Sequence, residues 1–413
     1  MKLRQAKLPK GWEMKKLGEV CDELFAGGDV PKDNYSKAKS DVHNFPIYSN
    51  GEKNKGLYGF TNVIRVNKPS ITISARGTIG YSEIRKENYY PVIRLIVVIP
   101  RIEILDLFFL NYVISSIDFT HSGSSIPQLT VPMIKEYPIP VPPLPEQKLI
   151  VAILDKAFAA IAKAKANAEQ NLKNTKELFE SYLQSVFDPS TRSGQGSEGW
   201  EDRRLGESDL IEIIDGDRGK NYPTQKDFND EGFCLFINTK NVRPTGFEFN
   251  TTMFISEAKD KSMGKGKLRR NDVVMTTRGT IGNLGVYNEE VEYENIRINS
   301  GMLIFRPNQK QITSDYLFEI LRSGIIKEQI KKQVTGAAQP QLPIKTLVNF
   351  IFPVPKSIKA QQTIVKKLDA LSAETKKLEA IYQQKINDLE ELKKSILQKA
   401  FSGELKTTNA IAL

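Results

Sequence analysis

Residues 145–187 read PEQKLIVAILDKAFAAIAKAKANAEQNLKNTKELFESYLQSVF, and this stretch decides the fold. Apolar and small side chains recur in it at alternating spacings of four and three residues, which is typical of a coiled-coil seam. No Gly interrupts the run, and Pro occurs only at its start, where a first helical turn tolerates it. Such a helix is not stable alone, so the pattern predicts a partner helix. The main seam positions are Ile150, Leu154, Ala157, Ile161 and Leu178.

The predicted partner helix lies in the same chain, because Ile364 begins a matching run 214 positions after Ile150. Asn171 and Lys385 occupy equivalent polar positions in the two runs. They either fix the register of the helices or lie where the seam opens to solvent. The apolar seam positions of the second run are Ile364, Leu368, Leu371, Leu378, Leu389 and Leu392.

The repeat extends beyond these helices and divides the chain into two halves. Each half opens with Gly-Trp-Glu and Leu-Gly-Glu, carries Arg-Gly-Thr-Ile-Gly, and continues with Pro-Gln-Leu and Pro-Val-Pro. The distance between equivalent motifs grows from 188 positions at the first to 214 at the helices. This pattern indicates one duplicated unit whose loops have changed length between shared landmarks.

Each half is predicted to be a mixed α/β domain. Alternating and continuous apolar runs predict strands at 70–75, 93–99, 272–277 and 301–305, and helices at 104–117 and 314–323. The polar, low-complexity stretch 188–198 is expected to be a linker. The expected order is a globular domain at 11–142, a helix at 143–187, the linker at 188–198, a second domain at 199–355 and a second helix at 356–402.

Composition limits the class of protein. The chain has 413 residues, two Cys and two His, which excludes a Cys/His zinc framework and a disulfide scaffold. Its apolar runs are too short to cross a membrane, so we expect a cytoplasmic protein with no membrane partner. The formal net charge of +10 is compatible with a nucleic-acid partner but does not establish one.

The repeated Arg-Gly-Thr-Ile-Gly motif is the most specific local signal. Glycines after a strand permit positive φ, while Arg and Thr supply donors suited to phosphate. The alternative is a tight turn that the two halves share for folding alone. The candidate DNA contacts in the two motifs are Arg76, Gly77, Thr78, Arg278, Gly279 and Thr280.

Three further groups are candidate DNA contacts. The first is a basic cluster that could follow phosphates or could be a solvated charge run, formed by Lys259, Lys261, Lys265, Lys267, Arg269 and Arg270. The second is a loop with side chains that can read or stack on bases, or that fill an ordinary loop: Tyr48, Asn50, Lys53, Lys55 and Tyr58. The third lies in polar loops before the Pro-rich segments: Ser124, Gln128, Gln339 and Gln341.

Catalytic signatures are absent from the sequence. It contains no phosphate-binding Gly-rich loop with a Lys-Ser/Thr ending and no Gly-x-Ser-x-Gly. We therefore expect no catalytic residues, no metal site and no bound cofactor. A fused nuclease or methyltransferase remains a less favoured alternative.

These motifs together resemble the specificity (S) subunit of type I restriction–modification systems over about residues 11–405. The phrases Pro142–Gln147 and Ala400–Leu405 are among the most typical. The second half departs from the family at Pro355–Gln361, which lacks the Pro-Glu-Gln of the first copy. This departure leaves the flanking heptads aligned.

The resemblance implies two target-recognition domains that each read one half of a split, asymmetric DNA site. The two helices would pack antiparallel with pseudo-twofold symmetry and set the spacing between half-sites. Two methyltransferase (M) subunits would bring S-adenosylmethionine, and restriction (R) subunits would bring ATP and Mg²⁺. The chain itself would be a non-catalytic subunit that binds double-stranded DNA. The alternative is a stand-alone coiled-coil scaffold or interaction protein with two binding modules.

Overall fold

The computed structural model describes residues 8–119, 128–188, 199–333 and 341–405. It divides into two units, Met1–Glu169 with Gln383–Leu413 and Gln170–Tyr382. Both long helices, α3 (Leu144–Phe187) and α9 (Ile358–Ser402), contribute one end to each unit. Most of the predicted linker 188–198 lies outside the described residues.

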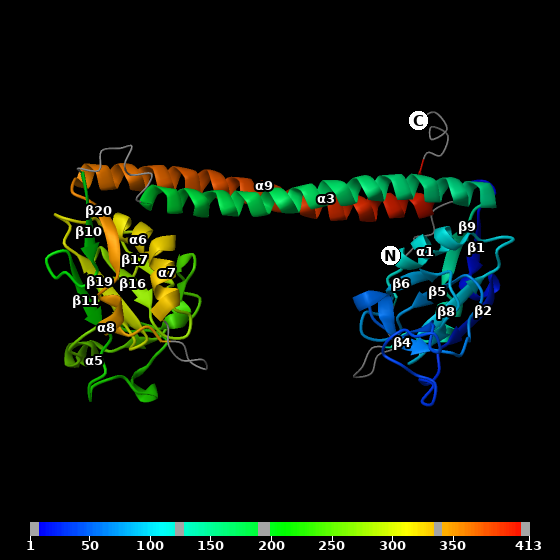
Figure 1. Cartoon of the computed structure of the whole chain (residues 1–413), viewed down its shortest axis with the longest axis horizontal. Coiled ribbons are helices and arrows are strands. Elements are labelled where there is room, and N and C mark those ends of the chain that lie inside the picture. Colours follow the sequence, from blue (N-terminus) through cyan, green and yellow to red (C-terminus); the bar gives the residue numbers. More distant parts are fainter. Residues whose placement is uncertain (1–7, 120–127, 189–198, 334–340, 406–413) are drawn as a thin grey trace. The chain divides into compact units, whose positions relative to one another are not determined.

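The first unit is built on a four-stranded antiparallel sheet with a smaller sheet beside it (Figure 1). The large sheet has the order β2 (Cys21–Ala26), β8 (Ile96–Pro100), β5 (Ser70–Ile73) and β6 (Ser82–Arg85). The small sheet has the order β4 (Leu57–Thr61), β3 (Phe45–Tyr48) and β7 (Tyr90–Pro91). Helices α1 (Leu107–Ser116) and α2 (Val131–Lys135) follow, and β1 (Glu13–Lys16) pairs with β9 (Pro138–Val141).

The second unit repeats this topology with different loops. Its large sheet has the order β11 (Ile211–Asp215), β19 (Met302–Pro307), β16 (Asp272–Thr276) and β17 (Leu284–Tyr287). Its smaller sheets are β15 (Phe254–Ile255), β12 (Cys234–Ile237) and β18 (Ile296–Ile298), and β13 (Val242–Arg243) with β14 (Gly246–Phe247). Strand β10 (Trp200–Arg204) pairs with β20 (Ile351–Pro355). Its helices are α5 (Glu257–Ser262), α6 (Ser314–Leu321), α7 (Gly324–Gln333) and α8 (Ile344–Leu347). The predicted duplicated α/β fold is confirmed.

The shared Leu-Gly-Glu motif has a packing role in both units. Leu17 and Leu205 are fully buried. A Cβ at Gly206 would lie 2.6 Å from the Val348 side chain, and one at Gly18 would lie 3.2 Å from Lys135. A larger residue at Gly206 would therefore displace Val348 after α8, whereas one at Gly18 would need a small shift of Lys135 in α2.

The long helices pack antiparallel within each unit. In the first unit, Ile150 and Leu154 near the start of α3 share a core cluster with Ala400 and Phe401 near the end of α9. In the second unit, Leu183 and Phe187 near the end of α3 share a cluster that also holds Val365 and Leu368. The predicted pairing of the two helices is thus present in both units.

Three predicted seam residues are not buried: Leu178, Leu378 and Leu392 are 53%, 38% and 47% exposed. In α3 the buried positions Ile161, Ala168 and Thr175 recur every seven residues. The small side chains of Ala168 and Thr175 allow the two helices to pack closely along this row of residues. The seam positions that alternate with this row, such as Leu178, therefore face outward. Asn171 and Lys385 belong to these outward positions and are exposed.

The remaining predicted seam residues lie on the contact side. Ile150, Leu154, Ile161 and Leu368 are buried, and the others are half-buried. These half-buried residues are Ala157, Ile364, Leu371 and Leu389. Within the described ranges, no helix combines the length and apolarity needed to cross a bilayer.

A buried glutamine joins each long helix to the domain beneath it. In the first unit, the Gln147 side chain accepts from Asp106 N at 2.8 Å and donates to the carbonyls of Ile104 and Pro142 at 2.9 and 2.7 Å. Gln361, 214 positions later, bonds in the same way to Thr313 N, Gln311 O and Pro355 O. Asp106 and Thr313 are the N-caps of α1 and α6. One amide therefore satisfies three backbone groups and fixes where the helix leaves its domain.

Replacing Gln147 by Ala should lower the free energy of unfolding by about 2–4 kcal/mol, because three backbone groups lose their partner in the interior. Denaturant unfolding followed by circular dichroism measures this change. Gln170→Ala, at an exposed position of the same helix, is the control and should change stability by less than about 0.5 kcal/mol. Equal effects of the two substitutions would contradict the anchoring role.

Candidate nucleic-acid interface

The Arg-Gly-Thr-Ile-Gly motif forms the same exposed turn in both units. It follows β5 in one and β16 in the other. Gly77 and Gly279 both have φ of 71°, while Gly80 and Gly282 have φ of 86° and 90°. These left-handed conformations favour glycine, as the sequence predicted. The Arg and Thr side chains of both turns are exposed.

The Gln-Leu part of the Pro-Gln-Leu motif lies against this turn in both units, a proximity that the sequence alone did not indicate. Leu129 N donates to Ala75 O at 2.9 Å, and Leu342 N donates to Thr277 O at 3.0 Å. The guanidinium of Arg76 donates to Gln128 Oε1 at 2.8 Å. In the second unit, Arg278 and Gln341 form a backbone bridge. Two candidate residues, Ser124 and Gln339, lie outside the described residues.

In the first unit, the loop after β3 is tied to the same turn. Asn50 Oδ1 accepts from Ala75 N at 2.7 Å, and Asn50 Nδ2 donates to Ile93 O at 2.6 Å. Both ends of this amide therefore bind backbone, which gives Asn50 a positioning role. Lys55 forms an ion pair with Glu83 at 2.8 Å, whereas Lys53 and Tyr58 are exposed.

Arg85 holds this loop from beneath. It is 3% exposed and donates to Lys55 O at 2.5 Å and to Thr72 Oγ1 at 3.1 Å. Its guanidinium lies 3.5 Å from the centre of the Tyr48 ring. Burial, together with a hydrogen bond to Glu87, raises the pKa of Tyr48 to about 12. Tyr48 is thus a neutral, partly buried member of the support and not an open stacking platform.

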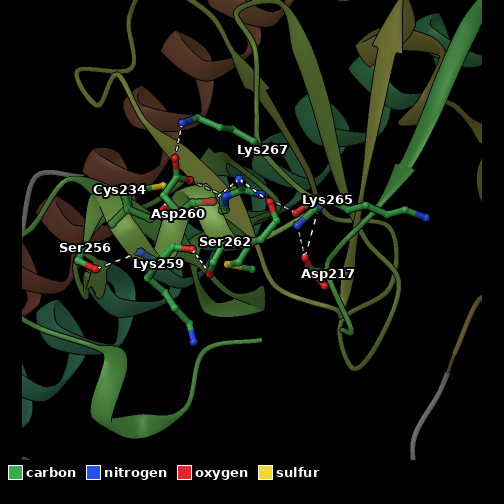
Figure 2. Close-up of polar contacts among 12 residues, drawn as sticks. Asp217, Cys234, Ser256, Lys259, Asp260, Ser262, Lys265 and Lys267 are labelled. Atoms are coloured by element: carbon green, nitrogen blue, oxygen red, sulfur yellow. Dashed lines mark hydrogen bonds and ion pairs between the residues drawn. The ribbon is translucent and has the colours of Figure 1, made fainter. Parts of the chain in front are cut away.

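In the second unit, a buried ion pair holds the basic loop, of which Figure 2 labels Asp260, Lys265 and Lys267. Arg297 and Asp260, 5% and 2% exposed, bond through Nε and Oδ1 at 2.5 Å. Arg297 also donates to the carbonyls of Lys265 and Met263 at 2.7 and 3.2 Å. Lys267 adds a second ion pair to Asp260 at 2.5 Å. One buried arginine thereby fixes the backbone from α5 to Lys267.

Two carboxylates that bond to this loop have lowered pKa values: Asp260 within it and Asp217, which follows β11. Burial alone would raise the pKa of Asp260, but Lys267 and Arg297 outweigh it and keep the pKa below its ordinary value. Burial would likewise raise the pKa of Asp217, but backbone N–H groups of Gly219, Gly264 and Lys265 lower it. Figure 2 shows Asp217 bonded to this backbone, with Gly264 N at 2.7 Å.

The six predicted basic residues of this unit divide into two groups. Lys259, Lys261 and Lys267 pair with Asp227, Glu257 and Asp260, and Arg270 donates to the carbonyls of Asn288 and Val291. Lys265 and Arg269 are exposed and line a cavity of about 560 Å³ that Arg306 also lines. Four of the six are thus engaged by ion pairs or backbone carbonyls, whereas Lys265 and Arg269 are exposed at the cavity, which Lys267 also lines.

Comparison with known proteins identifies the family. The family model "Type I restriction modification DNA specificity domain" matches residues 9–173 and 197–391. The chain belongs to this specificity family. In the described part of this specificity protein, no group of three or more His, Cys, Asp or Glu side chains is placed to hold a metal ion.

Individual relatives support this membership. A putative type I specificity subunit of Mycoplasma pneumoniae is 37% identical over 172 residues, which is 42% of this chain and about half (51%) of that relative. The EcoBI specificity subunit of Escherichia coli is 26% identical over 71% of this chain and 63% of its own length. A solved chain from a study of type I restriction–modification complex assembly matches with TM-score 0.76 at 21% identity, covering 97% of this chain and all of that chain. The structural likeness shows the fold.

The supporting arginines of this specificity-family chain were not predicted from the sequence. Arg85 is the last residue of β6 (SEIR) and Arg297 is the middle residue of β18 (IRI), and neither short strand has a pattern that indicates a buried arginine. Their partners lie 30 and 32 residues away in loops without regular pattern. Sequence reasoning therefore identified the exposed cations but not the buried ones that position them.

Replacing Asp260 by Ala should cost about 3–5 kcal/mol of unfolding free energy, because Arg297 would remain buried without its counter-charge. The pKa of Asp260 is lowered in the folded state, so its contribution is complete above its ordinary value of 3.8 and is lost as pH falls through the lowered pKa. The stability difference between wild type and variant should therefore shrink at acid pH. Denaturant unfolding at several pH values measures it, with the exposed Asp230→Ala as control. A pH-independent difference would contradict this account.

Proposed function

We propose that this chain binds double-stranded DNA and reads a bipartite, asymmetric site, one half with each globular domain. One observation carries the proposal: both units present the same exposed Arg-Gly-Thr-Ile-Gly turn against a Pro-Gln-Leu segment, surrounded by loops that differ. Shared donors suit the phosphates, which are alike everywhere on DNA. Different loops suit two different base sequences.

The charge and backbone of the turn support phosphate binding. The chain carries a net charge of +10, and Arg76 and Arg278 occupy equivalent exposed positions. A Cβ at Gly77 or Gly279 would meet nothing within 4 Å, so the space in front of each turn is open. Exposed N–H groups in such a turn can approach a phosphate closely.

We further propose that the chain directs other subunits to this site and is itself non-catalytic. The relatives named above are specificity subunits of type I restriction enzymes. Two methyltransferase subunits would supply S-adenosylmethionine chemistry, and restriction subunits would supply ATP- and Mg²⁺-dependent steps. Exposed leucines on the long helices suit this docking: Leu178 and Leu378 in the second unit and Leu392 in the first. Large apolar side chains in water commonly mark protein interfaces.

Exchanging residues 11–142 for the equivalent domain of another specificity subunit should change one half-site and leave the other unaltered. The two domains hold separate sheets and cores, so their loops should read DNA independently. Sequencing of methylated adenines in cells that express the chimaera with its methyltransferase measures both half-sites. A chimaera in which both half-sites change would refute the division of labour.

Arg76→Ala and Arg278→Ala should each weaken DNA binding across sequences and reduce the slope of log affinity against log salt by about 1. The reason is that each removes one phosphate contact and its counterion release. Fluorescence anisotropy with a labelled duplex at several salt concentrations measures the slope. Arg101→Ala is the matched control, an exposed arginine paired with Asp22 at 3.6 Å. An unchanged slope in both test variants would argue that the turns serve folding alone.

A further inference from the structure

A strained corner lies between β7 and β8 of the first unit. Ile93 and Arg94 have φ of 54° and 59°, in the left-handed region that branched side chains rarely adopt. Across the described residues, the other non-glycine residues with positive φ are Asn54, Lys55 and Asn271. Ile93 is therefore the β-branched member of this small set, and its backbone conformation is the least favourable for its side chain.

Three hydrogen bonds hold this corner in its strained form. Ile93 N donates to Gly28 O at 2.8 Å, and Arg94 N donates to Gly27 O at 3.1 Å. Asn50 Nδ2 donates to Ile93 O at 2.6 Å. A Cβ at Gly27 would lie 2.6 Å from the Pro91 backbone, so a glycine is required for the two backbone segments to lie this close together. The surrounding structure thus stabilises the strain instead of relaxing it.

Packing does not explain the isoleucine. The Ile93 side chain is 44% exposed, and Arg94 is exposed beside it. An apolar, branched side chain that is both strained and half in water contributes little to the stability of its own domain. Strain of this kind is typically found where a residue contacts a ligand.

The second unit shows that the scaffold does not require these two residues. Val98 pairs with Ile71, and Phe305 pairs with Val273, five residues before Arg76 and Arg278 of the repeated turn. Counting back five positions from Val98 and Phe305 places Ser300 opposite Ile93. Gly301 then stands where the first unit has Arg94. The second unit therefore makes the equivalent corner from a small polar residue and a glycine, and neither Ser300 nor Gly301 has positive φ.

The corner adjoins the turn assigned above to phosphate. The Asn50 amide bridges Ala75 N, immediately before Arg76, and Ile93 O. The guanidinium of Arg65 lies beside Gly28, within 3.0 Å of a Cβ position there. Ile93 is thus an exposed apolar group in a neighbourhood that also contains exposed arginines.

We propose that Ile93 determines specificity by packing against a thymine methyl group in the half-site that the first domain reads. This inference rests on the proposed DNA-binding function. The C5-methyl of thymine is the apolar feature that base pairs display in the major groove. Arg94, next in the chain, binds an adjacent phosphate. The different residues at the equivalent corner of the second domain give that domain a different preference.

The test uses the full chain with its methyltransferase and the duplex defined by methylation mapping. Ile93→Gly removes the side chain and suits the left-handed backbone, so Tm should stay the same or rise while affinity falls about tenfold. Ile93→Ser with Arg94→Gly, which copies the second unit, should also fold and lose affinity. Ile102→Ser is the matched control, since Ile102 follows the other end of β8 and is 68% exposed. It should leave affinity unchanged.

Duplexes in which deoxyuridine replaces each thymine of the first half-site locate the contact. Wild type should lose affinity at one such position, and Ile93→Gly should not distinguish thymine from deoxyuridine there. If wild type binds specifically but Ile93→Gly binds equally well, or if no replacement weakens wild type, this inference is wrong and the proposed function stands. If wild type does not bind any mapped duplex specifically, the proposed function fails first.

Discussion

A buried glutamine at the first turn of each long helix is the interaction on which the rest of each unit depends. Gln147 and Gln361 satisfy backbone groups from the helix entrance and from the segment before α1 or α6. A buried backbone group without a partner lowers the stability of the fold by about as much as a lost hydrogen bond. These hydrogen bonds therefore favour one position of the helix start relative to the segment before α1 or α6. Each glutamine therefore ties the start of a long helix to the start of the helix that packs on the domain, α1 or α6.

The sequence predicted the parts of the fold that depend on local pattern. Heptad spacing identified α3 and α9, and repeated motifs identified two copies of one topology. The outward-facing Leu178 and Leu378 were predicted wrongly as seam residues, because the register of a contact depends on the size of side chains on both helices. Ala168 and Thr175 are small enough to draw the helices together over one row. The apolar pattern of a single helix does not show which of its seam positions face the partner helix.

In the candidate site, too, the features set by neighbouring residues were predicted from the sequence, and those set by distant contacts were not. Positive φ in the repeated turn followed from glycine spacing alone, as at Gly77 and Gly279. The supports did not, because Arg85 and Arg297 act on loops about thirty residues away. A buried arginine is costly unless its charge and donors are satisfied, so its presence indicates a geometry that must be held. The two units meet this requirement with different arginines on different strands, which fits loops that have diverged on a shared scaffold.

Duplication within one chain supplies an internal control that separates framework from function. Gln147 and Gln361 are buried and make equivalent hydrogen bonds in both copies, so folding suffices to explain this pair. Ile93 has positive φ at a corner where the second copy has Ser300 without positive φ, so the shared scaffold does not require the strained form. Hydrogen bonds within the first domain hold this strain, and its absence from the second copy points to a role beyond folding. In a chain whose two domains are proposed to read different sequences, the exposed corner beside the shared turn is where that difference belongs.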